Sequence, residues 1–321
     1  MGAFGRNHAR IYHQLAQQGQ AVRLVGVVDE DPARADAVAG EFGCRAFGSV
    51  EQLMTTHSEV QAASVAVPTR QHLEIARALM ESGVDVLVEK PLAPSLQEGD
   101  EMIRLAQSLH RIGQTGHLER FNPAVRATVP IITQPMFFEV HRLSVFTPRS
   151  LDVDVILDLM IHDLDVVLSF VNSPVKEIRA VGLPILSAKT DIANVRLEFE
   201  SGCVANFTAS RVSTERVRKL RFFQPRQYVS LDYGRQDVLV FSVGEAAGTP
   251  SVNPQIKVAK PPITAEEPLQ AELRSFLESV RTRSRPLVSF EDGHRALALA
   301  LEIVTAIKEH GHKIHLDQLH N

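Results

Sequence analysis

The chain of 321 residues has 44% hydrophobic and 22% charged residues, the composition of a folded globular protein long enough for about two domains. Its formal net charge of −4 gives no support for a nucleic-acid partner or for binding to an anionic membrane surface. The two cysteines, Cys44 and Cys203, cannot form a disulfide framework and lack metal-ligand spacing, so a cytoplasmic location is expected.

The chain begins with part of a dinucleotide-binding pattern. The complete fingerprint is G-x-G-x-x-G between a strand and a helix, followed about twenty residues later by an acid that binds the ribose 2′-hydroxyl. Gly2 and Gly5 have the spacing of its last two glycines, a helix is expected after Gly5, and a strand over 22–29 ends in Asp29. No arginine directly follows Asp29, which favours NAD, although Arg34 is close enough to leave NADP open.

The first glycine of this fingerprint and the strand before it are missing. That strand is central in a doubly wound sheet, so its absence predicts open strand edges and a reduced core. One hypothesis is a misplaced start codon, with Met1 at the variable position between the first two glycines. An N-terminal peptide of the natural protein that starts at Met1 or Gly2 would contradict it. The first residues also lack the apolar core of a signal peptide.

Helices and buried strands then alternate with short connections. Helices are expected over 31–42, from Ser49, up to Ser82 before Gly83, and from Ser95 to about residue 110. Strands are expected over 45–47, 62–67, 84–89 and 112–116. This order predicts an α/β fold with a doubly wound, Rossmann-type sheet as a dinucleotide-binding domain over 1–118.

Two of these strands end in distinctive residues. Pro68-Thr69, with His72 one turn later, follows the strand over 62–67, and Glu89-Lys90-Pro91 follows the apolar run that starts at Val84. Ligands of open α/β sheets bind beyond the carboxyl ends of the strands, so Lys90 stands where chemistry is expected. An isolated lysine in this position would more simply be a surface residue.

The segments V-P-T-R-Q-H-L-E-I-A and V-L-V-E-K-P-L-A resemble the glucose–fructose oxidoreductase and inositol dehydrogenase (Gfo/Idh/MocA) family of NAD(P)-dependent oxidoreductases. The likeness extends from Gly2 to the C-terminus and is strongest over residues 65–93. It implies that Lys90 hydrogen-bonds the substrate hydroxyl and the nicotinamide ribose, and it admits a cis peptide before Pro91. The cofactor-binding residues that it implies are Gly2, Gly5, Asp29, Arg34, Pro68, Thr69, His72, Glu89 and Lys90.

Two roles are open for the amine of Lys90. The positive charge of an oxidised nicotinamide ring would favour its neutral form, which could assist removal of the hydroxyl proton. The alternative is a role in positioning alone.

Residues 119–321 are expected to form a substrate-binding and oligomerisation domain with C-terminal helices. The segment that connects the two expected domains, H-L-E-R-F-N-P over 117–123, is polar enough to bind a hydroxylated or anionic substrate. A hinge between the domains could by itself explain Asn122-Pro123. Strands over 136–143, 176–182, 191–200, 203–210, 219–223, 227–232 and 237–243 predict a large, mainly antiparallel open sheet. One free face of such a sheet suits a homodimer or homotetramer.

A loop over 244–262 and two helices, over 268–282 and 292–309, complete the expected elements. No internal repeat or low-complexity tract occurs in the sequence.

A helix over 151–170 carries Asp158 and His162 at i and i+4, with Asp165 further along the same face. A carboxylate can orient an imidazole that accepts a proton, so His162 is a candidate base with Asp158 as its support. The family resemblance assigns the same two residues, through its D-x-x-x-H pattern. Bulky residues stand here where most relatives have small ones, which suggests a differently shaped pocket.

This helix also has simpler interpretations. The acids could form a solvated face, which is the expectation for Asp163 or Asp165, and His162 could be a structural residue. No third ligand has suitable spacing, so no metal site is predicted. The charged residues of this apolar segment exclude a membrane span.

The substrate class rests on arginines and on a finer resemblance. Five basic residues cluster between two expected strands: Arg211, Arg216, Arg218, Lys219 and Arg221. Arginine forks suit a diphosphate, although such clusters are usually solvated strand edges. With this cluster, the H-L-E-R-F-N-P segment and the D-V-D-V-I-L-D-L-M-I-H-D helix, the chain is similar to a branch of the family that oxidises the sugar 3-hydroxyl of UDP-N-acetylglucosamine-type substrates. Alternatives are a dehydrogenase of a free polyol or simple sugar, and a non-catalytic nicotinamide-binding regulator. The candidate substrate-binding residues are Arg120, Asn122, Arg149 and Arg211.

Overall fold

The computed structural model describes residues 2–148, 151–244 and 255–314. The chain divides into two compact units, each of which is described by itself: unit 1 comprises residues 1–121 and 267–297, and unit 2 comprises residues 122–266 and 298–321. The sequence had suggested that everything after residue 118 forms the second domain. The packing instead groups α8 (Pro268–Thr282) and the first turns of α9 (Phe290–Lys313) with unit 1.

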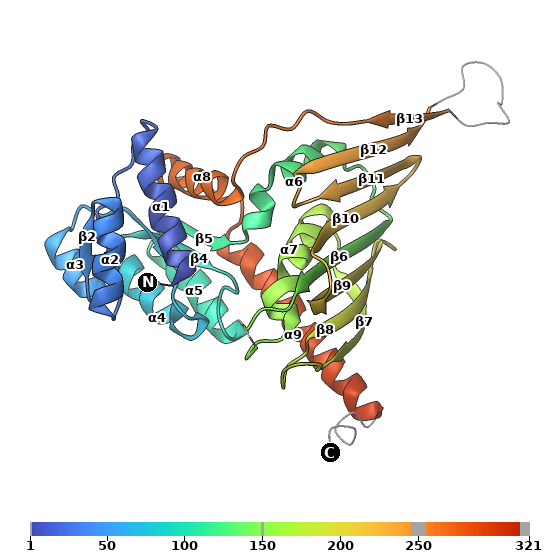
Figure 1. Ribbon diagram of the computed structural model, residues 1–321, viewed down its shortest axis with the longest axis horizontal. Coiled ribbons are helices and arrows are strands. Elements are labelled where there is room, and N and C mark those ends of the chain that lie inside the picture. The colour runs from blue at the N-terminus through green and yellow to red at the C-terminus, as the bar shows by residue number, and fades with distance from the viewer. Residues whose placement is uncertain (1, 149–150, 245–254, 315–321) are drawn as a thin grey trace. The chain divides into compact units, whose positions relative to one another are not determined.

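Unit 1 alternates helices and short strands along the chain (Figure 1). Besides α8 and the start of α9, its helices are α1 (Ala3–Gln17), α2 (Pro32–Phe42), α3 (Val50–Thr56), α4 (His72–Glu81) and α5 (Leu96–Ser108), with the 3₁₀ turns η1 (Thr69–Gln71) and η2 (Leu118–Phe121). Helix α1 packs against α2 and α8, while α4 packs against α3 and α5, which gives the two helical layers of a doubly wound fold. The strands are β1 (Gly26–Val28), β2 (Arg45–Phe47), β3 (Ala62–Val65), β4 (Asp85–Glu89) and β5 (Gly113–Gly116).

Local sequence explains where these helices begin and end. The Ser49 and Ser95 hydroxyls accept backbone N–H groups in the first turns of α3 and α5, and Asp31 does the same for α2. Gly43 ends α2 with φ of 65°, and Gly83 follows α4 with φ of 86°, a conformation that glycine adopts readily. The predicted caps are therefore confirmed.

The parallel sheet of unit 1 is in two pieces. β1 pairs only with β2, whereas β3, β4 and β5 pair in that order. Within the described residues, β1 and β3 each have one strand neighbour, and both line the same cavity. The predicted open edges are confirmed. The strand expected over 22–29 is shorter than predicted, since pairing is confined to Gly26–Val28.

Unit 2 is built on an unbroken eight-stranded sheet in the order β13-β12-β11-β10-β6-β9-β8-β7. β6 and β9 run parallel and every other neighbouring pair is antiparallel, as expected for a mainly antiparallel sheet. The strands are β6 (Phe137–Val145), β7 (Val175–Leu183), β8 (Ile192–Phe199), β9 (Val204–Ser213), β10 (Val217–Gln224), β11 (Gln227–Asp232), β12 (Asp237–Val243) and β13 (Ile256–Ala259). β13 corrects the prediction of a loop over 244–262, because pairing with β12 orders a segment without strong periodicity.

Helices cover one face of this sheet (Figure 1). They are α6 (Pro123–Thr128), α7 (Ile161–Phe170) and the later turns of α9, with the 3₁₀ turn η3 (Val129–Ile131) and the π-helical turn η4 (Ile156–Met160). Phe138 and Phe222 pack against Phe170 of α7 on the covered face. In the described residues, none of the helices is long and apolar enough to cross a membrane.

Two expectations for the helix over 151–170 are wrong. The helical segment begins only near Val155 and opens with the π turn η4 rather than a regular α-helix. Asp163 and Asp165 are not solvated, since each is only 2% exposed. Burial of Asp163 is possible because Arg142, from the neighbouring strand β6, neutralises its charge.

Candidate active site

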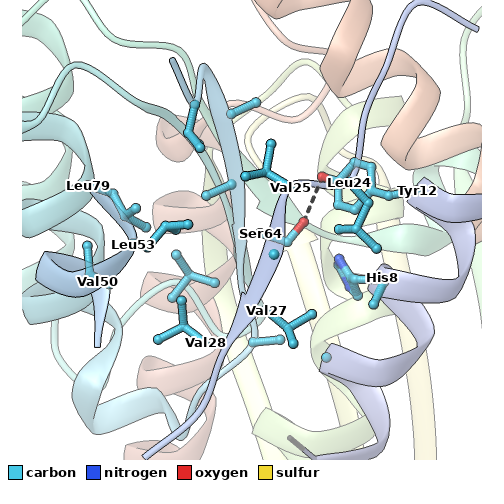
Figure 2. A pocket seen from close by; sticks show the side chains of 18 of the residues that line it. His8, Tyr12, Leu24, Val25, Val27, Val28, Val50, Leu53, Ser64 and Leu79 are labelled. Atoms are coloured by element: carbon cyan, nitrogen blue, oxygen red, sulfur yellow. Dashed lines mark hydrogen bonds between the residues drawn. The ribbon is translucent and has the colours of Figure 1, made fainter. Parts of the chain in front are cut away.

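Five of the nine residues predicted to bind a dinucleotide line one cavity of unit 1, whereas Thr69, His72, Glu89 and Lys90 are not part of its lining. Its volume is about 1390 Å³, and Gly2, Gly5, Asp29, Arg34 and Pro68 all line it. Figure 2 shows Leu53 and Leu79 on one side of the pocket and His8 and Tyr12 of α1 on the other. The cavity also runs between β1 and β3, so it joins the cofactor region to the gap in the sheet.

The N-terminus of α1 suits an anionic group. Gly2 is the N-cap residue, contributes no capping side chain, and has open space where a Cβ would stand. The first turn carries no acidic residue. Helix N-termini present backbone N–H groups and a positive partial charge to phosphates. These features fit the pyrophosphate of a dinucleotide, for which Gly2 and Gly5 were selected from the sequence.

Asp29 lies directly after β1, where the ribose-binding acid was expected. Its Oδ1 accepts the Asp31 N–H at 2.9 Å and lies 3.5 Å from Arg34 Nη2. Burial of the carboxylate raises the pKa of Asp29, but hydrogen bonds, that from the Asp31 N–H among them, outweigh it and leave the pKa below its ordinary value, with a smaller contribution from the charge of Arg34. The side chain is therefore an anion that can accept hydrogen bonds from ribose hydroxyls.

Lys90 stands at the end of β4, whose five residues are all buried. The Lys90–Pro91 peptide is cis, as the family resemblance admits. His72 holds this turn from the neighbouring strand end, with Nδ1 at 3.1 Å from Pro91 O and Nε2 at 3.0 Å from Val67 O. Burial lowers the pKa of His72 despite its carbonyl partners. Thr69 lies in η1, one turn before His72.

Glu89 is buried beside Lys90 and contacts a residue that the sequence reasoning missed. His8 Nε2 lies 2.8 Å from Glu89 Oε1. His8 is 2% exposed and comes from α1, three residues after Gly5. A histidine on the buried face of an amphipathic helix is a signal that could have found it, because such a ring needs a polar partner.

His117 follows β5 and adds a neutral group close to Lys90. Burial, with smaller contributions from the charges of Lys90 and Arg120, lowers the pKa of His117 to about 3. Arg120, in η2, is partly exposed and donates from Nη2 to Leu287 O at 3.3 Å. At the carboxyl ends of β4 and β5, Lys90 and Glu89 thus lie close enough to His117 for their charges to affect its pKa.

In unit 2, Asp158 lies within the π turn η4 and His162 in the first turn of α7. The N–H groups of Leu157 and Asp158 both donate to Asp154 O at 3.0 Å. π turns inside helices are frequent at functional sites. Because the turn is wider than an α turn, it changes the presentation of Asp158 relative to His162 in a way that the i, i+4 spacing did not predict.

The helix that carries His162 is held by a buried ion pair. Arg142 donates to both carboxylate oxygens of Asp163, at 2.6 and 2.9 Å, and both side chains are less than 5% exposed. The Arg142 guanidinium also lies 5.2 Å from the centre of the Tyr233 ring. Asn122 caps α6 through Ala124 N and donates to Tyr233 O at 3.1 Å. Asn122 therefore has a structural role in unit 2, beside the substrate role that the sequence suggested.

Arg211 is also engaged in structure. It donates to Val153 O, lies 3.6 Å from Asp191, and is 5% exposed. Asp191 in turn accepts the N–H groups of Ile185, Leu186 and Ser187. Burial raises the pKa of Asp191, but these hydrogen bonds outweigh it and leave the pKa below its ordinary value. Arg149 lies outside the described residues. Among the residues that the structure describes, no group of three or more His, Cys, Asp or Glu could hold a metal ion.

Comparison with known proteins places this geometry in context. Residues 1–117 match the family model described as "Oxidoreductase family, NAD-binding Rossmann fold", and residues 131–227 match the "GFO/IDH/MocA C-terminal domain". The chain is 36% identical over 309 residues to UDP-N-acetylglucosamine 3-dehydrogenase of Acidithiobacillus ferrooxidans, covering 96% of this chain and 95% of that protein.

Further matches agree with the first. The chain is 25% identical over 228 residues to scyllo-inositol 2-dehydrogenase (NAD(+)) of Bacillus subtilis, covering 66% of each. A solved structure of the Acidithiobacillus ferrooxidans UDP-N-acetylglucosamine 3-dehydrogenase superposes with a TM-score of 0.87 at 34% identity, covering 96% of this chain and 95% of that one.

Proposed function

Because the chain belongs to the Gfo/Idh/MocA family of oxidoreductases, we propose that it is a dehydrogenase that oxidises the sugar 3-hydroxyl of a UDP-N-acetylglucosamine-like nucleotide sugar with NAD as acceptor. The observation that carries the proposal is the Glu89-Lys90-Pro91 turn. It stands at the end of a fully buried strand, in the unit whose cavity is lined by five of the residues predicted to bind a dinucleotide.

The cofactor role is divided among the residues around the cavity. The N-terminus of α1 at Gly2 and Gly5 would hold the pyrophosphate, and Asp29 would accept the ribose hydroxyls. The carboxylate charge at Asp29 favours NAD over NADP, because a 2′-phosphate would meet like charge there. Pro68 and Thr69 would line the path towards Lys90. Bound NAD supplies the acceptor for the hydride.

Three side chains would act on the substrate hydroxyl. His162 takes the proton, Asp158 orients the imidazole, and Lys90 polarises the same oxygen. His117, neutral because of its burial, adds no positive charge beside Lys90. The charge of the Lys90 amine is therefore not opposed by a second cation and can act on the reacting oxygen. A positional role alone for Lys90 is the competing assignment.

The nucleotide-sugar class rests on the relative that is 36% identical over 96% of this chain and on the connecting segment around Arg120. Arg120 is partly exposed, so its guanidinium can reach a diphosphate in the way that arginine forks do. Arg211 and Asn122 are less suited, since each is nearly buried and bonded to backbone atoms of unit 2. Arg149 stays a candidate.

A homo-oligomer through the uncovered face of the unit 2 sheet is part of the proposal. On that face, Phe137, Phe223, Tyr228 and Phe241 form a cross-strand ladder with ring centres 4.9 to 5.7 Å apart. Val258 continues the row on β13 and is 60% exposed. Rows of exposed aromatic side chains are typical of protein interfaces. Replacing Phe223 with Glu should dissociate the oligomer in analytical ultracentrifugation, and an unchanged mass would contradict this surface.

The substrate is tested by following NADH formation with UDP-N-acetylglucosamine, UDP-glucose, glucose and myo-inositol. Turnover on UDP sugars alone supports the nucleotide-sugar assignment. Turnover on free sugars or polyols would overturn it and favour the simpler dehydrogenase. If NADH binds while no substrate is oxidised, the regulator alternative gains support, although a pure binder has no need for Lys90, Asp158 and His162 together.

A further inference from the structure

We propose that His8 is a positioning residue that holds the Glu89-Lys90-Pro91 turn against helix α1 through Glu89, and thereby sets the place of the Lys90 amine. This inference rests on the proposed dehydrogenase function. It starts from a buried contact between residues 81 positions apart in the sequence, with His8 Nε2 at 2.8 Å from Glu89 Oε1. The side chains are 3% and 12% exposed.

The contact joins two functional elements. His8 lies one turn into α1, on the same buried face as Gly5, at the end of the helix that suits a pyrophosphate. Glu89 is the last residue of β4 and directly precedes Lys90. A carboxylate that is ionised can only accept, so His8 Nε2–H is the donor. This hydrogen bond therefore links helix α1 to the Glu89-Lys90-Pro91 turn, called here the lysine turn.

Other contacts also hold this turn in place. Glu89 is paired with Gly116 of β5, and a Cβ at Gly116 would lie 3.0 Å from the Glu89 carboxyl carbon and from Oε2. His72 contacts Pro91 O and Leu92 O on the far side of Lys90. Glu89 is thus confined between β5 and α1, with Oε2 against Gly116 and Oε1 against His8. A shift of the imidazole would free the carboxylate and rotate the backbone that carries Lys90.

The test compares two polar replacements that differ in reach. The amide nitrogen of a glutamine can take the place of His8 Nε2, whereas that of an asparagine ends near the place of Nδ1. We expect His8→Gln to keep kcat near the parent value, and His8→Asn to lower kcat by about ten- to a hundredfold, the order found for misplaced catalytic groups. The affinity for NADH should be similar in both variants.

His13→Asn is the matched control. His13 lies on the same helix, and its Nε2 makes a contact of the same length, 2.8 Å to Gln17 Nε2, that does not involve the lysine turn. We expect it to leave kcat unchanged. Equal kcat values for His8→Asn and His8→Gln, or an equal loss in His13→Asn, would overturn the proposal and leave His8 as a residue of general stability.

A second readout separates this inference from the proposed function. Reductive methylation with ¹³C-formaldehyde labels the lysine amines, and the Lys90 resonance is identified by its loss in Lys90→Met. We expect this resonance to move in His8→Asn and to keep its position in His8→Gln and His13→Asn. If the parent oxidises no sugar, the proposed function fails, yet this comparison still decides whether His8 positions Lys90. An unmoved resonance in His8→Asn overturns the inference even in an active enzyme.

Discussion

The two sheets of this protein support their candidate functional residues in different ways. The parallel sheet of unit 1 is split between β1 and β3, and its candidate chemistry stands on strand ends and short turns. The sheet of unit 2 runs unbroken through eight strands, and its candidate chemistry stands on a helix packed over one face. The difference shows that local contacts can hold a candidate catalytic turn in an interrupted sheet, whereas a helix on a sheet depends on side-chain packing and charge.

The largest expected effect is at the lysine turn of unit 1. Lys90→Met should lower kcat by about two to four orders of magnitude, the usual contribution of a group that assists proton transfer, while NADH binding persists. Initial rates of NADH formation and NADH fluorescence titration measure the two quantities. Turnover close to that of the parent would show that the strand end carries no chemistry. Arg70→Met, on the nearby turn η1, serves as a control for a surface charge.

The helix of unit 2 is tested through its buried ion pair. Asp163→Asn leaves the Arg142 charge buried without its carboxylate, so the free energy of unfolding should fall by about 3–5 kcal/mol. Arg142→Met combined with Asp163→Leu should recover much of that loss, because both charges are removed together. Urea denaturation of the parent and the two variants gives the values. A loss in the double variant as large as in Asp163→Asn would contradict the ion-pair account.

A pH effect is expected from the buried imidazole of unit 1. Burial lowers the pKa of His117 from the ordinary 6.5 to about 3 in the folded protein, so the unfolded chain binds a proton first as the pH falls. Stability should therefore decline between pH 6.5 and about 3, and His117→Gln should reduce the slope. Unfolding free energies measured across this range test the sign. Parallel curves for the parent and His117→Gln would show that His117 does not titrate in this way.

The smallest effect concerns the backbone of the two sheets. Among the described strands, β1 has one neighbour, whereas β9 lies between β6 and β8. Amides of Val27 and Val28 should exchange with a free energy of opening lower by on the order of a few kcal/mol than those of Ala205 and Phe207. Hydrogen exchange followed by NMR measures both sets. Equal protection would mean that the helices of unit 1 compensate fully for the split sheet.

Much of the fold could be predicted because its signals are local. Serine and aspartate caps, glycine stops and apolar runs placed nearly every helix and strand of unit 1, and the incomplete glycine fingerprint predicted the open strand edges. The predicted helix over 151–170 was less accurate. Hydrophobic periodicity does not distinguish a π turn from an α turn, and it gives no information about the cation that buries Asp163.

The sequence by itself determined the family, the order of the elements and the strand-end motifs that contain Asp29, Pro68 and Lys90, because these depend on residues close together in the chain. Only the tertiary structure decided which residues support them. His8 meets Glu89 across 81 positions, and Arg142 meets Asp163 from another element. Such pairs form because a buried charge or imidazole must find a polar partner, and the chain's folding, not its periodicity, selects which one.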